Sequence, residues 1–247
     1  MRAHFSAPTP RFGRVNNRLH VGNQQRSPFY WWWTYLRRNE DYLACCEAGG
    51  KGKLAALYAD FGDVREDDFH KWWTHDSRGV VLFAEEPLAV KFGELESAAE
   101  WRKGWYAEET MVVVVPLRVS KRRLKGLFAR LLDARHTGKQ GRPAMDLLDS
   151  TARYALSQNY TIRHLQTTMD IYEKWLKNKA VPKKGQLALW EIGREENLNK
   201  KAIKDALSDF AHDRLVGRNI LAATVSRYVR QAKAIIANTA KGRFPVH

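Results

Sequence analysis

Cysteine, long apolar runs and, in the second half, carboxylates are scarce in this chain of 247 residues. The two cysteines are neighbours, Cys45 and Cys46, so a disulfide between them is strained and they lack the spacing of a zinc site. The longest apolar run, residues 111–115, is far shorter than the roughly 20 residues of a membrane span. The first residues contain no apolar secretory signal. We therefore expect a cytoplasmic protein without disulfides or membrane contact.

The scarcity of carboxylates begins near residue 117. Residues 1–117 hold 15 Lys+Arg and 16 Asp+Glu, a net charge of −1. Residues 118–247 hold 27 Lys+Arg and 11 Asp+Glu, a net charge of +16. Such a field speeds encounter with a polyanion and gives salt-sensitive affinity. The distribution predicts DNA or RNA as the partner.

The pattern of apolar residues predicts a mainly α fold. The N-terminal half is expected to be α+β, with a few short strands such as 79–84 and the β-branched run 110–119, which is predicted to be buried. The C-terminal half is expected to be helical, with an interrupted helix-turn-helix. The predicted domains are a flexible basic arm (1–27), a Trp-rich α+β module (28–119), a basic helical module (120–180) and a helix-turn-helix-like module (187–247), with a linker at 177–186.

Aromatic side chains crowd the start of a helix that is predicted to run from Pro28 to Glu47. They can form a stacking platform for single-stranded bases. Tryptophans at helical spacing more often form a core or a partner interface. The residues that we assign to a partner interface are Trp31, Trp32, Trp33 and Tyr35.

Three further helices are predicted, at 121–135, 146–158 and 161–177, with a turn at 136–143 after the first of them. Basic residues lie along these helices and in the turn. That turn lacks the spacing of a P-loop, so nucleotide hydrolysis is not expected. Cations on helices and in glycine-containing turns suit phosphate contact. The predicted DNA-backbone contacts are Lys121, Arg122, Lys125, Lys139, Arg142, Lys200, Lys201 and Lys233.

Two segments near the C-terminus suggest a helix-turn-helix. Residues 187–199 place the small Gly193 between Ile192 and Leu198, as in a first helix and its turn. Residues 223–233 form an amphipathic helix whose polar side suits base recognition. The predicted base-contacting residues are Thr224, Ser226, Arg227, Arg230 and Gln231. A predicted helix at 202–210 separates the two segments, so either the motif is interrupted or the match is coincidental.

The motif Thr-Val-Ser-Arg at 224–227, followed by an apolar pair, resembles the recognition helix of LacI-like helix-turn-helix proteins. That resemblance implies that Thr224 and Ser226 stand at the start of a helix and that Arg227 reaches into the groove. Residues 33–42, Trp-Thr-Tyr-Leu-Arg-Arg-Asn-Glu-Asp-Tyr, are similar to the W-x-[FY]-L-R-R-N-x-x-Y opening of small regulator-like proteins from proteobacterial integrative elements. The whole chain resembles phage and prophage proteins that share a Tyr-Trp-Trp-Trp start, here residues 30–33, and segments at 138–143, 189–193 and 225–245. This wider resemblance implies a DNA-associated protein of a mobile element.

Catalytic patterns are weak. His70 and His75 miss the i, i+4 spacing of two ligands on one helix face, and Glu85 and Glu86 near Lys91 lack the remaining residues of a nuclease site. We therefore predict no enzymatic activity, no cofactor and no metal. The leading hypothesis is a double-stranded-DNA-binding regulator or accessory factor that acts as a dimer. The alternatives are a phage assembly protein that contacts nucleic acid non-specifically, and an RNA-binding protein.

Overall fold

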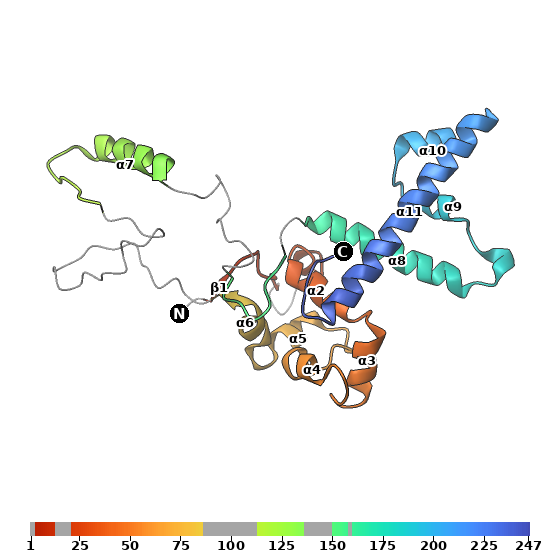
Figure 1. Cartoon of the computed structure of the whole chain (residues 1–247), viewed down its shortest axis with the longest axis horizontal. Helices are drawn as coiled ribbons and strands as arrows, with labels where there is room; N and C mark the ends of the chain where they lie inside the picture. Colours follow the sequence, from red (N-terminus) through yellow and green to blue (C-terminus); the bar gives the residue numbers. More distant parts are fainter. Residues whose placement is uncertain (1–2, 13–20, 86–112, 136–149, 158–159) are drawn as a thin grey trace. The chain divides into compact units, whose positions relative to one another are not determined.

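The computed structural model describes residues 3–12, 21–85, 113–135, 150–157 and 160–247. The chain divides into two compact units: unit 1 comprises Met1–Glu86 with Asp146–His247, and unit 2 comprises Pro87–Met145. The described elements are nearly all helices, with one antiparallel sheet of β1 (His4–Phe5) and β2 (Ala84–Glu85) (Figure 1). The predicted mainly α fold with few short strands is confirmed. None of the helices in these segments is long and apolar enough to cross a membrane.

The units do not follow the predicted domain boundaries. Residues 28–85 and 160–247 share one core and belong to unit 1, so the predicted modules 28–119 and 187–247 are not separate domains. The predicted basic module 120–180 is divided, because its first part lies in unit 2 and its last helix in unit 1. Charge patterns misplaced the boundaries because packing between distant segments, not composition, defines a domain.

The first part of unit 1 consists of short helices joined by tight turns. Their bounds are α1 Val21–Gln24, α2 Pro28–Leu36, α3 Glu40–Glu47, α4 Ala55–Phe61, α5 Phe69–Thr74 and α6 Arg78–Phe83, with a 3₁₀ turn at His75–Ser77. Side-chain oxygens cap three of the helices, since Ser27, Asn39 and Asp68 accept hydrogen bonds from the first turns of α2, α3 and α5.

The single helix predicted from Pro28 to Glu47 is two helices. α2 ends at Leu36, and Asn39, whose backbone is extended, caps α3 by accepting a hydrogen bond from the Tyr42 amide at 2.9 Å. The apolar period continues through the break, which is why periodicity missed it. Asparagine competes with the helical backbone for hydrogen bonds and so favours a cap over a helix interior.

The strand predicted at 79–84 is α6 over most of its length. Short apolar runs fit a strand or a buried helix equally well, so the choice is made by packing. Gly79 lies against the Trp73 indole, where a Cβ atom would come within 2.1 Å of the ring. This close approach fixes α6 against α5.

The predicted buried strand 110–119 is wrong over the part that is described, residues 113–119. Pro116 begins a turn in which its carbonyl accepts a hydrogen bond from the Val119 amide at 3.1 Å. Val114 is 92% exposed and Leu117 85% exposed. α7 (Lys121–Arg135) follows in unit 2 and confirms the helix predicted there.

Residues 150–157 are not helical, although a helix was predicted over 146–158. The Glu85 carboxylate binds this segment, accepting hydrogen bonds from the Ser150 hydroxyl at 2.8 Å and from the Thr151 and Ala152 amides at 2.7 and 3.0 Å. Farther along, Leu156 forms a parallel bridge with Phe244. These tertiary hydrogen bonds satisfy backbone groups of a non-helical segment and outweigh its helical pattern.

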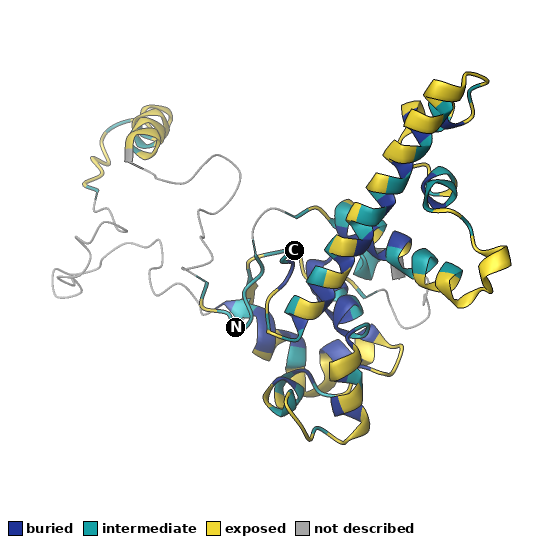
Figure 2. Ribbon diagram, turned by 45° about the vertical axis from the view of Figure 1, so that its right-hand side comes forward, coloured by how far each residue is buried: buried dark blue, intermediate teal, exposed yellow. Residues whose placement is uncertain are grey.

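Four helices complete unit 1: α8 Ile162–Ala180, α9 Leu189–Glu195, α10 Lys200–Ala206 and α11 Ala211–Thr239. The Thr161 hydroxyl caps α8 as predicted. α8, α9 and α10 each pack on α11, and α2 contacts its last turns (Figure 1). A stripe of buried residues along α11 faces these helices (Figure 2).

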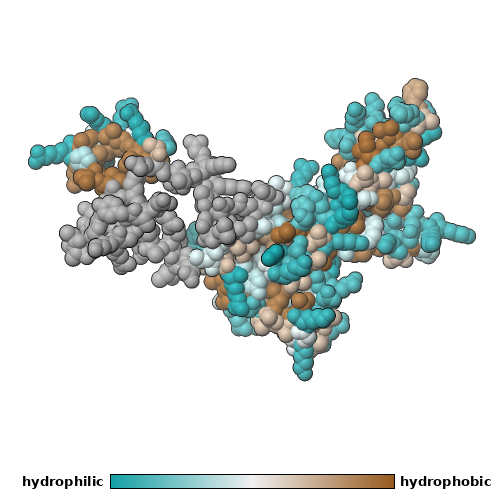
Figure 3. All heavy atoms as spheres, in the orientation of Figure 1, coloured by the Kyte–Doolittle hydropathy of each residue, from teal (hydrophilic) through white to brown (hydrophobic). Residues whose placement is uncertain are grey.

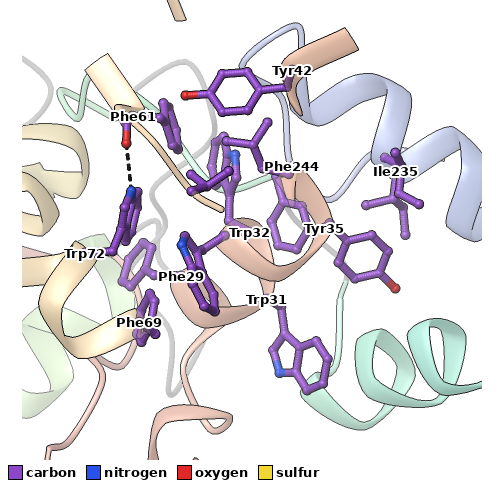
Figure 4. Packing of buried hydrophobic residues seen from close by; sticks show 14 of the residues in the cluster. Phe29, Trp31, Trp32, Tyr35, Tyr42, Phe61, Phe69, Trp72, Ile235 and Phe244 are labelled. Atoms are coloured by element: carbon purple, nitrogen blue, oxygen red, sulfur yellow. Dashed lines mark hydrogen bonds between the residues drawn. The ribbon is translucent and has the colours of Figure 1, made fainter. Parts of the chain in front are cut away.

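The aromatic side chains of α2 form the core. Trp31, Trp32, Trp33 and Tyr35 are each no more than 3% exposed. Trp32 stacks on Phe244 at 5.3 Å between ring centroids, and Figure 4 shows this packing together with the bond from the Trp72 indole N–H to the Phe61 carbonyl (2.7 Å). The assignment of these residues to a partner interface is therefore wrong, because their rings are covered by the chain's own helices. Cys45 and Cys46 are buried and free.

The predicted flexible arm is packed over the part that is described. His4 and Phe5 pair with β2, and the Phe12 ring lies 4.4 Å from the His70 ring. Phe5 also contacts Phe29 and Trp73 of the core. Residues 13–20, which contain Arg14 and Arg18, lie outside the described residues.

Candidate nucleic-acid interface

α11 is the frame on which the C-terminal helices are assembled. It is 29 residues long and has a buried stripe that includes Leu221, Val225 and Val229. α9 lies on this stripe through Gly193, where a Cβ atom would be 3.2 Å from the Leu221 Cβ and 3.3 Å from a Val225 methyl group. The small residue predicted for a helix-turn-helix is thus required by contact with α11.

α10 approaches α11 even more closely. At Gly217 of α11, a Cβ atom would lie 2.2 Å from the Ala206 nitrogen and 2.6 Å from the Ala202 carbonyl oxygen. The two helices therefore touch through their backbones, with Ala202, Ala206 and Leu221 forming a small core. This contact fixes which side of α10 faces outward.

α9 and α10 are joined by a four-residue turn, residues 196–199, as in a contiguous helix-turn-helix. Asn197 has a positive φ of 52°, a conformation that asparagine tolerates in turns. Asn199 caps α10 by accepting a hydrogen bond from the Ala202 amide at 3.0 Å. The helix following the turn is therefore α10, which the prediction treated as an insertion.

The segment that resembles a recognition helix does not begin a helix. α11 starts at Ala211, so Thr224 and Ser226 lie in its middle, and the expectation that they stand at a helix start is wrong. The Thr224 hydroxyl donates to the Ile220 carbonyl at 2.7 Å within the same helix. The match concerned residues 224–227 alone, whereas the helix that contains them begins at Ala211.

Arg227 and Arg230 are exposed on the side of α11 opposite its buried stripe. No carboxylate pairs with either guanidinium among the described residues, although that of Arg227 lies 5.7 Å from the Tyr228 ring centroid. Burial lowers the pKa of the nearby His164, and the proximity of His247 and Arg227 lowers it further.

Ser226 and Gln231 are only half-exposed. The Gln231 Oε1 atom is buried and has no hydrogen-bond partner in the described structure. Thr224 is half-exposed as well, so Arg227 and Arg230 are the two exposed residues among the five predicted base contacts.

Three lysines form the outward face of α10. Lys200 and Lys201, both predicted, are exposed together with Lys204, which sequence reasoning missed. Ala202 and Ala206 occupy the opposite face against α11. The sequence pattern could have predicted Lys204. With Ala202 and Ala206 on the buried side of the helix, Lys204 falls four residues after Lys200 and so on the same exposed side.

Cations also surround two half-buried tryptophans. Lys233, a predicted backbone contact, and Lys179 each place Nζ 4.6 Å from the Trp175 ring centroid. Arg194 and Arg218 lie 5.4 and 4.4 Å from the Trp190 ring centroid. Cation–π contacts hold these cations at the surface without neutralising their charge.

Ion pairing differs between the two parts of unit 1. In the first part Arg37, Arg65 and Lys71 pair with Asp67, Asp63 and Glu66. Within residues 160–247, Lys174 forms ion pairs with Glu195 and Glu196. The ion pairs of the described structure include no other Lys or Arg of this range that binds a carboxylate of the same range. The cations of α10 and α11 therefore remain available to an external anion.

The predicted contacts of the middle region divide between described and undescribed residues. Lys121, Arg122 and Lys125 are exposed on α7 of unit 2. Lys139 and Arg142 lie outside the described residues, together with the rest of the turn 136–143.

Groups that could support catalysis are not gathered in the described segments. No three His, Cys, Asp or Glu side chains there are placed to hold a metal ion. Glu85, considered for a nuclease site, uses its carboxylate to bind Ser150 and Thr151, while Glu86 and Lys91 lie outside the described part. A shallow surface depression between Asp63, Lys71 and Arg78 contains the Lys71–Glu66 ion pair.

Comparison with known proteins identifies no matching family model, no matching curated protein and no matching solved structure.

Proposed function

We propose that this chain binds double-stranded DNA through α11 and α10, as a non-enzymatic regulator or accessory factor of a phage or mobile element. One observation carries the proposal. Residues 214–247 contain seven Arg and Lys and no Asp or Glu. The carboxylate of α11 is that of Asp213 in its first turn, and the rest of the helix has none. The absence of carboxylates beyond the first turn avoids repulsion from phosphate, and the cations there release counterions from the duplex.

The outward side of α11 has the dimensions of a groove-binding helix. Arg227 and Arg230 are flanked there by the small exposed residues Ala223 and Ala237. A helix of about 10–12 Å diameter fits the major groove, which is about 12 Å wide. Continuous helices can cross this groove by their middle rather than their first turn. Arginine is the side chain best suited to guanine because it forms two hydrogen bonds to O6 and N7.

The lysines of α10 supply contacts of a second kind. Lys200, Lys201 and Lys204 are point charges on flexible stems and suit phosphate oxygens rather than base edges. Lys233 and the lysines of α7 are assigned to the same role. Such contacts orient the protein and strengthen binding to all sequences alike.

The test compares two double variants of equal charge in the full chain. DNA is selected from random sequence at about 150 mM salt, where purely electrostatic binding is weakened. Arg227→Ala with Arg230→Ala is expected to weaken binding to the selected DNA by about 1–3 kcal/mol per lost base contact. The control, Arg65→Ala with Lys71→Ala, removes two exposed cations that pair with Asp63 and Glu66 and is expected to leave affinity nearly unchanged.

Equal losses in the two variants would mean that net charge alone drives binding, and no loss in either would refute the interface on α11. The same experiment distinguishes the alternatives. An assembly protein yields no enriched sequence and coats any duplex, whereas an RNA-binding protein is displaced from duplex DNA by single-stranded RNA.

A further inference from the structure

Two histidines from distant parts of the chain meet beside Arg227 of α11. His164 lies in the first turn of α8, and His247 lies in the segment that follows α11. Their ring centroids are 6.1 Å apart. The His164 ring is also 5.7 Å from the Tyr228 ring, and the Arg227 guanidinium lies 5.7 Å from the centroid of that Tyr228 ring. Three segments of the chain therefore bring two imidazoles and one guanidinium to one place.

The position of His247 is fixed by the packing of the residues before it. Phe244 is fully buried and stacks on Trp32 of α2. The side-chain amide of Asn238, in the last turn of α11, donates a hydrogen bond to the Val246 carbonyl at 2.9 Å. This segment is thus anchored on both α2 and α11, and it holds the imidazole of His247 against the start of α8.

The charged groups that act on His164 are basic. Burial is the main cause of the lowered pKa of His164, and His247 and Arg227 lower that pKa further. Arg163 lies next to it on α8 and is exposed. Neither His164 nor His247 forms an ion pair with a carboxylate of the described residues. An external anion close to His164 would therefore favour its protonated form.

A metal ion fits this cluster less well than an anion. Zinc sites take at least three protein ligands, and in the described part of the chain no three His, Cys, Asp or Glu side chains are placed to hold a metal ion. The guanidinium of Arg227 would also repel a cation. A phosphate oxygen, in contrast, accepts charge-assisted hydrogen bonds from the N–H groups of an imidazolium and of a guanidinium.

The cluster borders the surface assigned to DNA. Arg227 belongs both to the cluster and to the exposed side of α11 that includes Arg230. On the face shown in Figure 3, hydrophilic side chains gather where α8 packs across α11, whereas hydrophobic side chains gather over α10. A duplex whose groove receives Arg230 would therefore bring its phosphate backbone close to the two histidines.

We propose that His164, His247 and Arg227 form a binding site for a backbone phosphate of duplex DNA, and that His164 takes up a proton when this phosphate binds. This site rests on the proposed function, since it adds a contact to the same interface. The proton comes from solvent and converts the neutral imidazole into an imidazolium, which donates an N–H to a phosphate oxygen.

Proton uptake makes DNA binding depend on pH. The bound phosphate favours the protonated imidazole, so the pKa of His164 is higher in the complex than in the free chain. DNA affinity therefore increases as the pH falls through the pKa that His164 has in the complex. The increase levels off below the pKa that His164 has in the free chain.

The test is the affinity of the full chain for one fixed duplex at constant salt, measured from about pH 8 to about pH 5.5. Wild-type affinity is expected to increase about tenfold over this range, because one proton is taken up. His164→Gln with His247→Gln keeps hydrogen-bonding side chains that do not titrate, so its affinity is expected to change less than about twofold. The control His212→Gln removes an exposed histidine from the first turn of α11 and is expected to keep the wild-type pH dependence.

A wild-type affinity that is independent of pH would overturn the proposal, as would a double variant with the wild-type pH dependence. Both outcomes leave DNA binding itself intact. A chain that binds no duplex at any pH would refute the DNA interface, and the phosphate site with it.

Proton NMR of the histidine rings gives an independent measurement on the wild-type chain, which does not depend on the folding of the double variant. The pKa of His164 is expected to lie below its ordinary value of 6.5 without DNA and to rise when the duplex is added. Inorganic phosphate at the same concentration of phosphate groups is expected to leave that pKa nearly unchanged, because a free phosphate lacks the other contacts of the duplex. An unchanged pKa in the complex would overturn the proposal. An equally large rise with inorganic phosphate would overturn the assignment to the DNA backbone.

Discussion

The side-chain amide of Asn39 donates a hydrogen bond to the backbone carbonyl of Ile236, 197 residues away, at 3.0 Å. The carbonyl oxygen of the same side chain accepts from the Tyr42 amide and caps α3. One buried asparagine therefore joins a local helix start to α11. This bond adds to the shared core in joining the Trp-rich segment and the C-terminal helices into one unit.

Other polar side chains of the motif at residues 33–42, those of Tyr35, Arg38 and Tyr42, also bond to residues outside it. The Tyr35 hydroxyl donates to the Leu165 carbonyl at 2.9 Å, and Arg38 pairs with Glu173 of α8. The Tyr42 hydroxyl donates to the Gly62 carbonyl at 2.8 Å. The motif that resembles the opening of regulator-like proteins is thus a set of structural connections in this chain.

Asn39→Ala is expected to lower the free energy of unfolding by roughly 1–3 kcal/mol, because it removes a helix cap and leaves a buried carbonyl with one donor fewer. Urea denaturation followed by circular dichroism measures the loss. Asn39→Asp keeps the cap but removes the donor to Ile236, so its unfolding free energy should also fall. An Asn39→Asp chain as stable as the wild type would show that the bond to α11 contributes nothing.

Trp32→Ala is expected to cost roughly 3–5 kcal/mol of stability, since a fully buried indole is lost between α2 and Phe244. Trp175→Ala, at a half-buried position on α8, serves as the control and should cost less. Thermal unfolding measures both. A Trp32→Ala chain with unchanged stability but altered oligomeric state would restore the partner-interface interpretation.

Gly217→Ala is expected to destabilise the α10–α11 hairpin by about 1–3 kcal/mol, because the added methyl group would overlap the α10 backbone. Helix propensity alone predicts the opposite sign. The matched variant is Gly126→Ala in α7, where a Cβ atom meets nothing within 4 Å and should raise helix stability. Hydrogen exchange of residues 200–206 detects the displaced helix, and unchanged protection there would contradict the packing argument.

Stability should fall in acid through Glu85. Burial by itself would raise the pKa of this carboxyl, but hydrogen bonds from Ser150, Thr151 and Ala152 outweigh burial and place its pKa below the ordinary value of 4.5. A carboxyl with a lowered folded-state pKa contributes stability above pH 4.5, and that contribution is lost as the pH falls through the folded-state pKa.

The measurement is unfolding free energy as a function of pH for the wild-type chain and Glu85→Gln. The variant should be less stable at neutral pH, because an amide cannot accept all of these bonds, and the difference should narrow in acid. Parallel pH profiles would show that Glu85 is not ionised in the folded chain.

Unit 2 should be removable. Glu85 on one side and residues 150–152 on the other are hydrogen-bonded, so a short Gly/Ser linker in place of residues 88–147 should leave unit 1 folded. The shortened chain loses five of the predicted phosphate contacts, Lys121, Arg122, Lys125, Lys139 and Arg142. If these contact phosphates, the slope of log affinity against log salt should decrease by about 0.9 per contact. A shortened chain that does not fold would show that unit 2 stabilises unit 1.

The sequence by itself determined the features that depend on neighbouring residues. The mainly helical character, α7, α8 with its Thr161 cap and the cationic second half follow from local periodicity, capping chemistry and charge. Only the tertiary structure decided the break at Asn39, the helical form of α6 and the start of α11 at Ala211. It also decided that the tryptophans are core. The physical reason is that each of these outcomes depends on contacts between segments distant in the chain, such as Asn39 with Ile236 and Gly217 with Ala206, which no local pattern encodes.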